Sequence, residues 1–184
     1  MKLHKIIALS TVLALSLNDS FAQKYATRMG KVSFFSTTPI ENIEAFNNEA
    51  AAAVDAQTGS VLFIIPIKSF KFEKALMQEH FNEDYMESNK YPKAQFKGNI
   101  SNLKEINFTK DGSYPAQVKG LMTMHGIEKQ ITVPGKIIIK GNSATLHSIF
   151  KVALADYNIK IPSIAKGKIA ETIEITVNSI LDKK

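Results

Sequence analysis

The stretch YPAQVKGLMTMHGIEKQITVPGKI, residues 114–137, decides the fold. In its first half, every second position on one side is apolar or small. Those positions are Tyr114, Ala116, Val118, Gly120, Met122 and Met124. This period of two is typical of a half-buried strand, and twelve residues at about 3.4 Å each span roughly 40 Å. Gly126 predicts a turn, so the stretch is expected to form a long antiparallel hairpin that suits a tilted barrel.

The second strand of this hairpin is expected over residues 128–140, with a bend or bulge at Pro134-Gly135 that marks a sheet edge. Similar β patterns predict strands over residues 30–36, 60–67, 94–101, 144–154 and 169–181. Residues 41–55 are ambiguous, because their alanines favour a helix, but they lack a helical apolar stripe and are assigned to a strand. About eight antiparallel strands result, and the residues alone leave a barrel and a sandwich open.

One helix is expected, over residues 73–88. Five residues share one of its faces at spacings of three and four: Leu76, Met77, His80, Phe81 and Tyr85. Pro92 ends the helical region, because the residue before a proline avoids helical backbone angles.

The first 22 residues have the composition of a cleaved secretory signal peptide. A positive start precedes an apolar run over residues 6–17, and Ser20-Phe21-Ala22 places small residues at the cleavage site. We therefore assign residues 1–22 to a signal peptide and residues 23–184 to one domain, and expect a periplasmic or secreted protein.

The composition argues against several classes of function. The chain has no cysteine, which excludes disulfides and thiolate chemistry. Its net charge of +6 comes from scattered lysines with one arginine, whereas nucleic-acid binding needs a concentrated basic patch. No nucleic-acid partner is expected, and this charge is compatible with weak, transient contact with anionic membranes. The sequence leaves a homodimer open.

Chemical motifs are scarce. His80, His125 and His147 lie far apart in the sequence, without a ligand-spacing motif, so no metal site is assigned. The acidic residues of the expected helix are interpreted as a solvated face. No catalytic residue is assigned, although an exported metal-dependent enzyme or stress protein that uses its histidines is kept as an alternative.

Phenylalanine and methionine dominate the positions expected to face inward. These are Phe34, Phe63, Phe96, Met122, Met124 and Phe150. Such side chains suit a long hydrocarbon ligand, but they are also ordinary core residues, so a ligand-free structural barrel is a further alternative.

Four stretches together resemble the YceI-like family of periplasmic polyisoprenoid-binding proteins. They are FSTTPIENIEAFNNEAAAAVDAQTGSVLFIIPIKSFKF (35–72), LMQEHFNEDYMESNKYPKAQFKGNI (76–100), YPAQVKGLMTMHGIEKQITVPGKI (114–137) and FKVALADYNIKIPSIAKGKIAETIEITVNSIL (150–181). The third stretch is the most specific and contains Gly120, His125 and Gly126. At residues 155–159, the arginine and glycine of many members are missing.

The resemblance implies a lipocalin-like, eight-stranded antiparallel barrel with a helical lid and an apolar tunnel. It implies no catalytic residue and no cofactor other than a bound polyisoprenoid or quinone lipid, which the protein would sequester or transport. The expected ligand-binding residues are Phe34, Phe63, Leu76, Met77, Phe81, Phe96, Met122, Met124, Phe150, Ile173 and Ile175. Of these, Leu76, Met77 and Phe81 are expected to close the tunnel from the helix.

Overall fold

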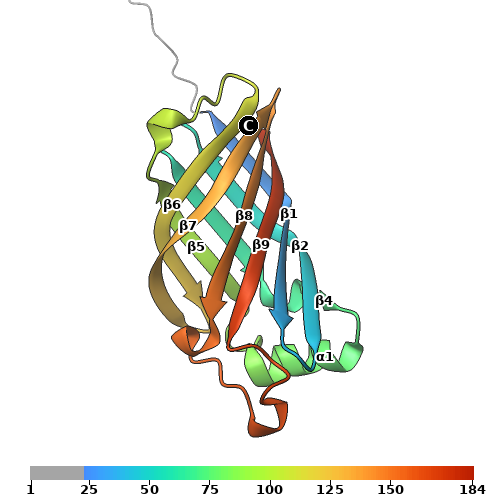
Figure 1. Cartoon of the computed structure of the whole chain (residues 1–184). Helices are drawn as coiled ribbons and strands as arrows, with labels where there is room; N and C mark the ends of the chain where they lie inside the picture. Colours follow the sequence, from blue (N-terminus) through green and yellow to red (C-terminus); the bar gives the residue numbers. More distant parts are fainter. Residues whose placement is uncertain (1–22) are drawn as a thin grey trace, which may run out of the picture.

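The computed structural model describes residues 23–184, so the expected signal peptide lies outside the described residues. Eight antiparallel strands form a closed barrel in the order β1-β9-β8-β7-β6-β5-β3-β2, and β1 pairs with β2 to close it (Figure 1). The strands are β1 (Lys24–Thr37), β2 (Asn42–Asp55), β3 (Ser60–Pro66), β5 (Lys93–Ile100), β6 (Gly112–Met124), β7 (Ile127–Lys140), β8 (Ser143–Ala153) and β9 (Thr172–Lys183). A two-residue strand, β4 (Lys71–Phe72), adds to β2. The predicted barrel is confirmed, and the sandwich does not form.

The hairpin of β6 and β7 forms as its alternation predicts. All thirteen residues of β6 pair with β7, from Gly112 opposite Ile139 to Met124 opposite Ile127. Its two-residue turn consists of His125 at φ 51° and Gly126 at φ 77°. Positive φ at both positions gives a turn whose twist matches that of the flanking strands. Gly126 is therefore explained by backbone geometry.

The N-terminal hairpin differs from the prediction in length. The strand expected over residues 30–36 begins at Lys24, because irregularities near Gly30 interrupt the alternation that would have revealed the earlier residues. A Cβ on Gly30 would lie 2.8 Å from the carbonyl oxygen of Ala50. The two strands approach closely there, so small residues are needed. The strand assigned to residues 41–55 is confirmed as β2, and tertiary pairing overrides the helical propensity of its alanines.

The helix is shorter than predicted. An α-helix, α1 (Ala75–His80), passes directly into a π-helical segment, η2 (Phe81–Tyr85), in place of a regular helix over residues 73–88. The backbone N–H of Met86 donates to the carbonyl of Phe81, at the wider spacing of a π-turn. Single π-turns within helices often occur at functional sites. None of the residues in α1 and η2 is fully buried, so the helix lies on the surface at one end of the barrel.

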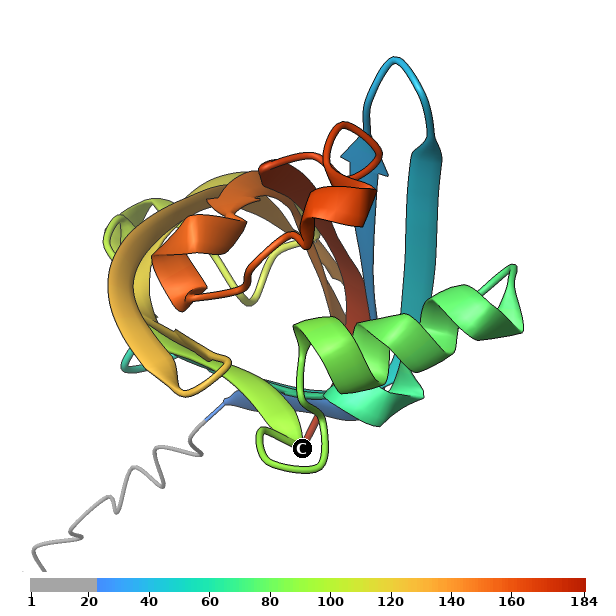
Figure 2. The ribbon, with the colours of Figure 1, turned by 90° about the horizontal axis from the view of Figure 1, so that it is seen from below.

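The wall is incomplete along two seams at this same end. Strand β7 pairs with β8 only over residues 136–140, and its earlier residues pair with β6 alone. Strand β2 likewise pairs with β3 only over residues 51–54. No bulge forms at Pro134-Gly135 in the pairing with β6, which continues in register through this dipeptide. The predicted sheet edge is confirmed, because the pairing with β8 stops at the next residue, Lys136. The 3-10 segments η4 (Leu154–Tyr157) and η5 (Ser163–Ala165) follow β8 at this end, where α1 also lies (Figure 2).

Candidate functional site

An apolar cavity of about 330 Å³ lies inside the barrel. Met77 and Phe81 line it from α1 and η2, and Ala116 and Val118 line it from the middle of β6. Valine, isoleucine, leucine, phenylalanine and methionine make up most of its lining. Pockets of roughly 300–1,000 Å³ hold small molecules, so the cavity is large enough for part of a hydrocarbon ligand.

Ten of the eleven residues predicted from the sequence to bind a ligand line this one cavity. They are Phe34, Phe63, Met77, Phe81, Phe96, Met122, Met124, Phe150, Ile173 and Ile175. Their contact with a ligand stays a prediction. The placement of Leu76 is wrong, because its side chain is 61% exposed and takes no part in the lining. The helix rests on the barrel through the face of Met77 and Phe81, and Leu76 precedes that face by about 100° of helical turn.

Phe81 rests on a cluster of phenylalanine rings. Its ring centroid lies 5.5 Å from those of Phe34 and Phe70 and 5.0 Å from that of Phe72. Aromatic pairs at such distances are favourable beyond the area that they bury. The cluster connects η2 to β1, β4 and the end of the 3-10 turn η1 (Ile67–Ser69), and it forms part of the cavity wall.

Sequence reasoning missed several lining residues for two different reasons. Val32, Ile137, Leu146 and Val177 lie on the inward faces of their strands, so the same alternation could have identified them. Phe70 and Phe72 lie in a short irregular segment, where no periodicity shows which side chain points inward.

Polar side chains contribute to the lining at two places. Glu41, His80 and Lys168 contribute near the helix and the loop that follows η4, and a 3.8 Å ion pair links Glu41 to Lys74. Lys136, His147 and Ser148 contribute at the seam between β7 and β8. Either place could contact the polar end of a ligand. The rest of that ligand would then lie against apolar side chains.

Two tyrosines near the cavity remain uncharged in ordinary conditions. Burial raises the pKa of the Tyr85 phenol, and the negative charge of Asp84 raises it further. Burial likewise raises the pKa of Tyr157, and the negative charge of Asp156 makes a smaller contribution in the same direction. Tyr85 lines the cavity directly, so its raised pKa helps to keep an ionised phenolate out of an apolar space.

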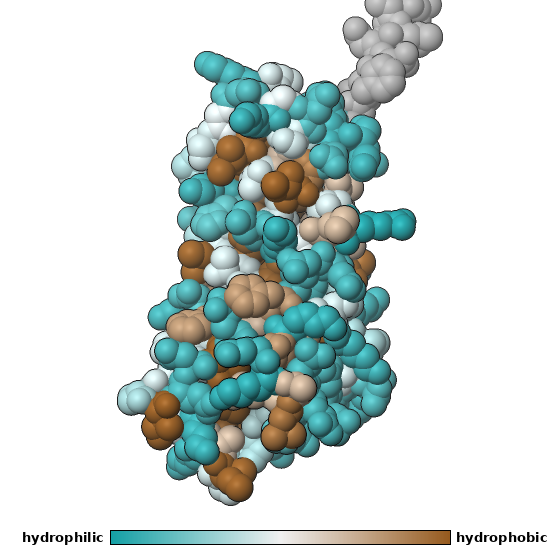
Figure 3. Space-filling view, turned by 90° about the vertical axis from the view of Figure 1, so that its right-hand side faces the viewer, coloured by the Kyte–Doolittle hydropathy of each residue, from teal (hydrophilic) through white to brown (hydrophobic). Residues whose placement is uncertain are grey.

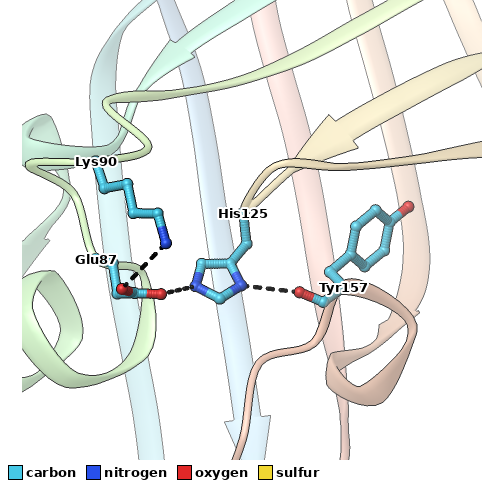
Figure 4. A network of polar contacts seen from close by, with 4 residues as sticks. All are labelled: Glu87, Lys90, His125 and Tyr157. Atoms are coloured by element: carbon cyan, nitrogen blue, oxygen red, sulfur yellow. Dashed lines mark hydrogen bonds and ion pairs between the residues drawn. The ribbon is translucent and has the colours of Figure 1, made fainter.

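His125 joins the two segments that cover the end of the barrel (Figure 4). Its Nε2 lies 2.8 Å from Oε2 of Glu87, just after the helix, and its Nδ1 lies 2.9 Å from the carbonyl oxygen of Tyr157 in η4. Both partners only accept hydrogen bonds, so each contact is a hydrogen bond donated by the ring nitrogen that faces it. Tyr91 packs against the ring with its centroid 4.7 Å away. We name Glu87, His125 and Tyr157 the clasp.

The clasp contributes to stability. We expect His125→Ala to lower the free energy of unfolding by about 2 kcal/mol, because two hydrogen bonds of a largely buried ring are lost. Urea denaturation followed by circular dichroism measures this change. His80→Ala, at an exposed histidine without such contacts in the described residues, is the control and is expected to change stability by less than about 0.5 kcal/mol. Equal losses in the two variants would contradict the role of the clasp.

The histidines do not assemble into a metal site within the described residues. No group of three or more histidine, aspartate or glutamate side chains there is arranged to hold a metal ion. Within residues 23–184, no helix is long and apolar enough to cross a membrane.

Comparison with known proteins agrees with this architecture. The family model described as YceI-like domain matches residues 23–180, which is most of the chain. A search of the curated proteins finds no match.

Solved structures share the fold at low sequence identity. A polyisoprenoid binding domain from Saccharophagus degradans, implicated in plant cell wall breakdown, superposes with a TM-score of 0.76 at 11% identity, over 89% of this chain and 99% of that domain. BcnA from Burkholderia cenocepacia gives a TM-score of 0.68 at 21% identity, over 82% and 95% of the two chains. The Campylobacter jejuni YceI protein gives 0.56 at 17% identity, over 74% and 81%.

Proposed function

Because this chain belongs to the YceI-like domain family, we propose that it is an exported protein that sequesters or transports a long isoprenoid-type lipid inside its barrel. The observation that carries this proposal is the apolar cavity, whose wall includes ten of the residues predicted to bind a ligand. The Saccharophagus degradans structure, described as a polyisoprenoid binding domain, supports the ligand class.

Binding requires no directional chemistry under this proposal. Each methylene group that moves from water into an apolar cavity contributes about 0.8 kcal/mol, so several prenyl units give tight binding. The rigid strands fix the shape of the cavity before the ligand arrives, which lowers the entropic cost of binding. Phenylalanine rings and flexible methionines such as Met122 and Met124 adapt to the bends of a prenyl chain.

The role is that of a carrier and not of an enzyme. The polar groups in the cavity wall lie near the helix and at one seam, so among residues 23–184 none supplies an acid, base or nucleophile to the middle of the cavity. The signal peptide expected over residues 1–22 would place the carrier in the periplasm or outside the cell, where a hydrocarbon lipid needs shelter from water.

Mass spectrometry tests the proposal directly. We expect native spectra of the purified protein to show a bound species of lipid mass, and organic extracts to release an apolar compound with the repeating mass of isoprene units. A protein that carries no lipid, and that takes up none when mixed with a polyprenol or a quinone, would contradict it. A tightly bound metal in the same spectra would favour the histidine-dependent enzyme instead.

A further inference from the structure

We propose that the loop over residues 158–170, together with the tip of the β1–β2 hairpin, docks the helix-covered end of the barrel on an anionic membrane surface. This proposal rests on the proposed function, because a carrier of long apolar lipids must load and unload where such lipids are dissolved. We call residues 158–170 the mouth loop.

The mouth loop combines basic and apolar residues. Its sequence, NIKIPSIAKGKIA, contains three lysines, four isoleucines and no acidic residue. Lys160, Lys166 and Lys168 are all exposed, and within residues 23–184 none of them forms an ion pair. Ile164 is 87% exposed in the short turn η5. Water is a poor environment for such a side chain, whereas the interface of a bilayer accepts it.

A second exposed isoleucine lies beside this loop. Ile40, at the tip of the β1–β2 hairpin, is 68% exposed, and its Cδ1 lies 3.5 Å from the position that a Cβ would take on Gly167. The backbone N–H of Ala170 donates to Oγ of Ser36, which fixes the loop to the same hairpin. The two isoleucines therefore belong to one connected surface. Figure 3 shows hydrophobic side chains among polar ones at this lower end of the molecule.

The charges around this surface favour a bilayer. The nearby acidic residues Glu41 and Asp156 are each paired with a lysine from elsewhere, Lys74 and Lys129. Glu171, directly after the mouth loop, is exposed and offsets part of the positive charge, but the loop lysines outnumber it three to one. Lysine stems cover apolar surface while their ammonium groups remain at the level of lipid head groups. Lys168 also lines the cavity, so docking through this loop would bring one wall of the cavity close to the membrane.

Vesicle co-sedimentation tests the proposal. We expect the protein to bind phosphatidylcholine vesicles that contain phosphatidylglycerol, to bind pure phosphatidylcholine weakly, and to dissociate at high salt. Each lysine close to an anionic surface raises the affinity for that surface about fivefold. The triple variant Lys160→Gln, Lys166→Gln, Lys168→Gln should therefore bind the anionic vesicles roughly 100-fold more weakly. Ile164→Ser should weaken binding about tenfold, because one buried apolar side chain is lost.

Matched controls lie away from the mouth loop. Lys104, Lys110 and Lys140 are exposed lysines at the opposite end of the barrel, and Ile180 is an exposed isoleucine on β9. Their substitution by glutamine and by serine should leave vesicle binding within about twofold of the parent protein. Equal losses from both lysine triples, or no binding of the parent protein to anionic vesicles, would overturn the docking surface.

Native mass spectrometry of the same preparations separates the two proposals. Lipid in the cavity without vesicle binding would leave the carrier function and remove the docking surface, as would binding to an acidic protein in place of vesicles. Vesicle binding by a protein that holds no lipid and takes up none from a polyprenol or a quinone would contradict the carrier function while leaving the docking surface.

Discussion

Val118→Trp is expected to abolish retention of a long apolar ligand while the barrel remains folded. Val118 faces the cavity from the middle of β6, opposite Ile100 on one neighbouring strand and Val133 on the other, and it is only partly buried. An indole at this position extends into the space that the ligand would occupy. If it displaces about five methylene groups, the loss is about 4 kcal/mol, or roughly 1,000-fold in Kd.

Titration with a fluorescent prenyl probe, together with lipid occupancy in native mass spectra, measures this effect. Leu121→Trp is the matched control, because Leu121 lies on the same strand with its side chain on the exposed outer face. The control should bind the probe as the parent protein does, and circular dichroism should show folded barrels for both. Unchanged affinity in Val118→Trp would mean that the ligand does not occupy the middle of the cavity.

Gly120→Ala is expected to cause the largest loss of stability. The expected loss is about 3 kcal/mol, because overpacking a well-packed site destabilises a protein by about this amount. Gly120 in β6 lies opposite Gly98 in β5. A Cβ on Gly120 would lie 2.3 Å from the carbonyl oxygen of Lys97 and 2.6 Å from the Cα of Gly98. These are backbone atoms, so β5 would have to move away from β6 and weaken their pairing.

Thermal and urea denaturation measure this loss. Gly141→Asn is a suitable control, because Gly141 has a φ of 55° in an open turn, and beyond its two chain neighbours no described residue has a heavy atom within 4 Å of the position of an added Cβ. Asparagine tolerates this conformation better than other residues with a Cβ, so a much smaller change is expected. If the denaturation midpoint of Gly120→Ala equals that of the control, β5 and β6 can move apart at little cost in stability.

The sequence predicts the strand residues of the cavity wall better than the helix and the contacts that cover the end of the barrel. Alternation in long strands identifies inward residues such as Met122 and Ile175, because a period of two leaves one face for the interior. The helix was predicted less well. Its apolar face predicts a regular helix, but the π-turn at Phe81 and the exposure of Leu76 depend on how the helix packs against the barrel. The clasp of His125 joins residues 38 and 32 positions away, and no local pattern predicts such a contact.

The pairing of β1 with β9 has a consequence for how the protein folds. The first strand lies between the second and the last, so the closing contacts join Tyr25 to Lys183 across nearly the whole domain. Contacts between residues so distant in the chain slow folding, because the intervening chain must be ordered before they form. Until Thr172–Lys183 is in place, β1 and β8 each expose an unpaired backbone edge, which is a template for aggregation. The newly made protein is therefore protected from aggregation through these two edges only after β9 has paired with both.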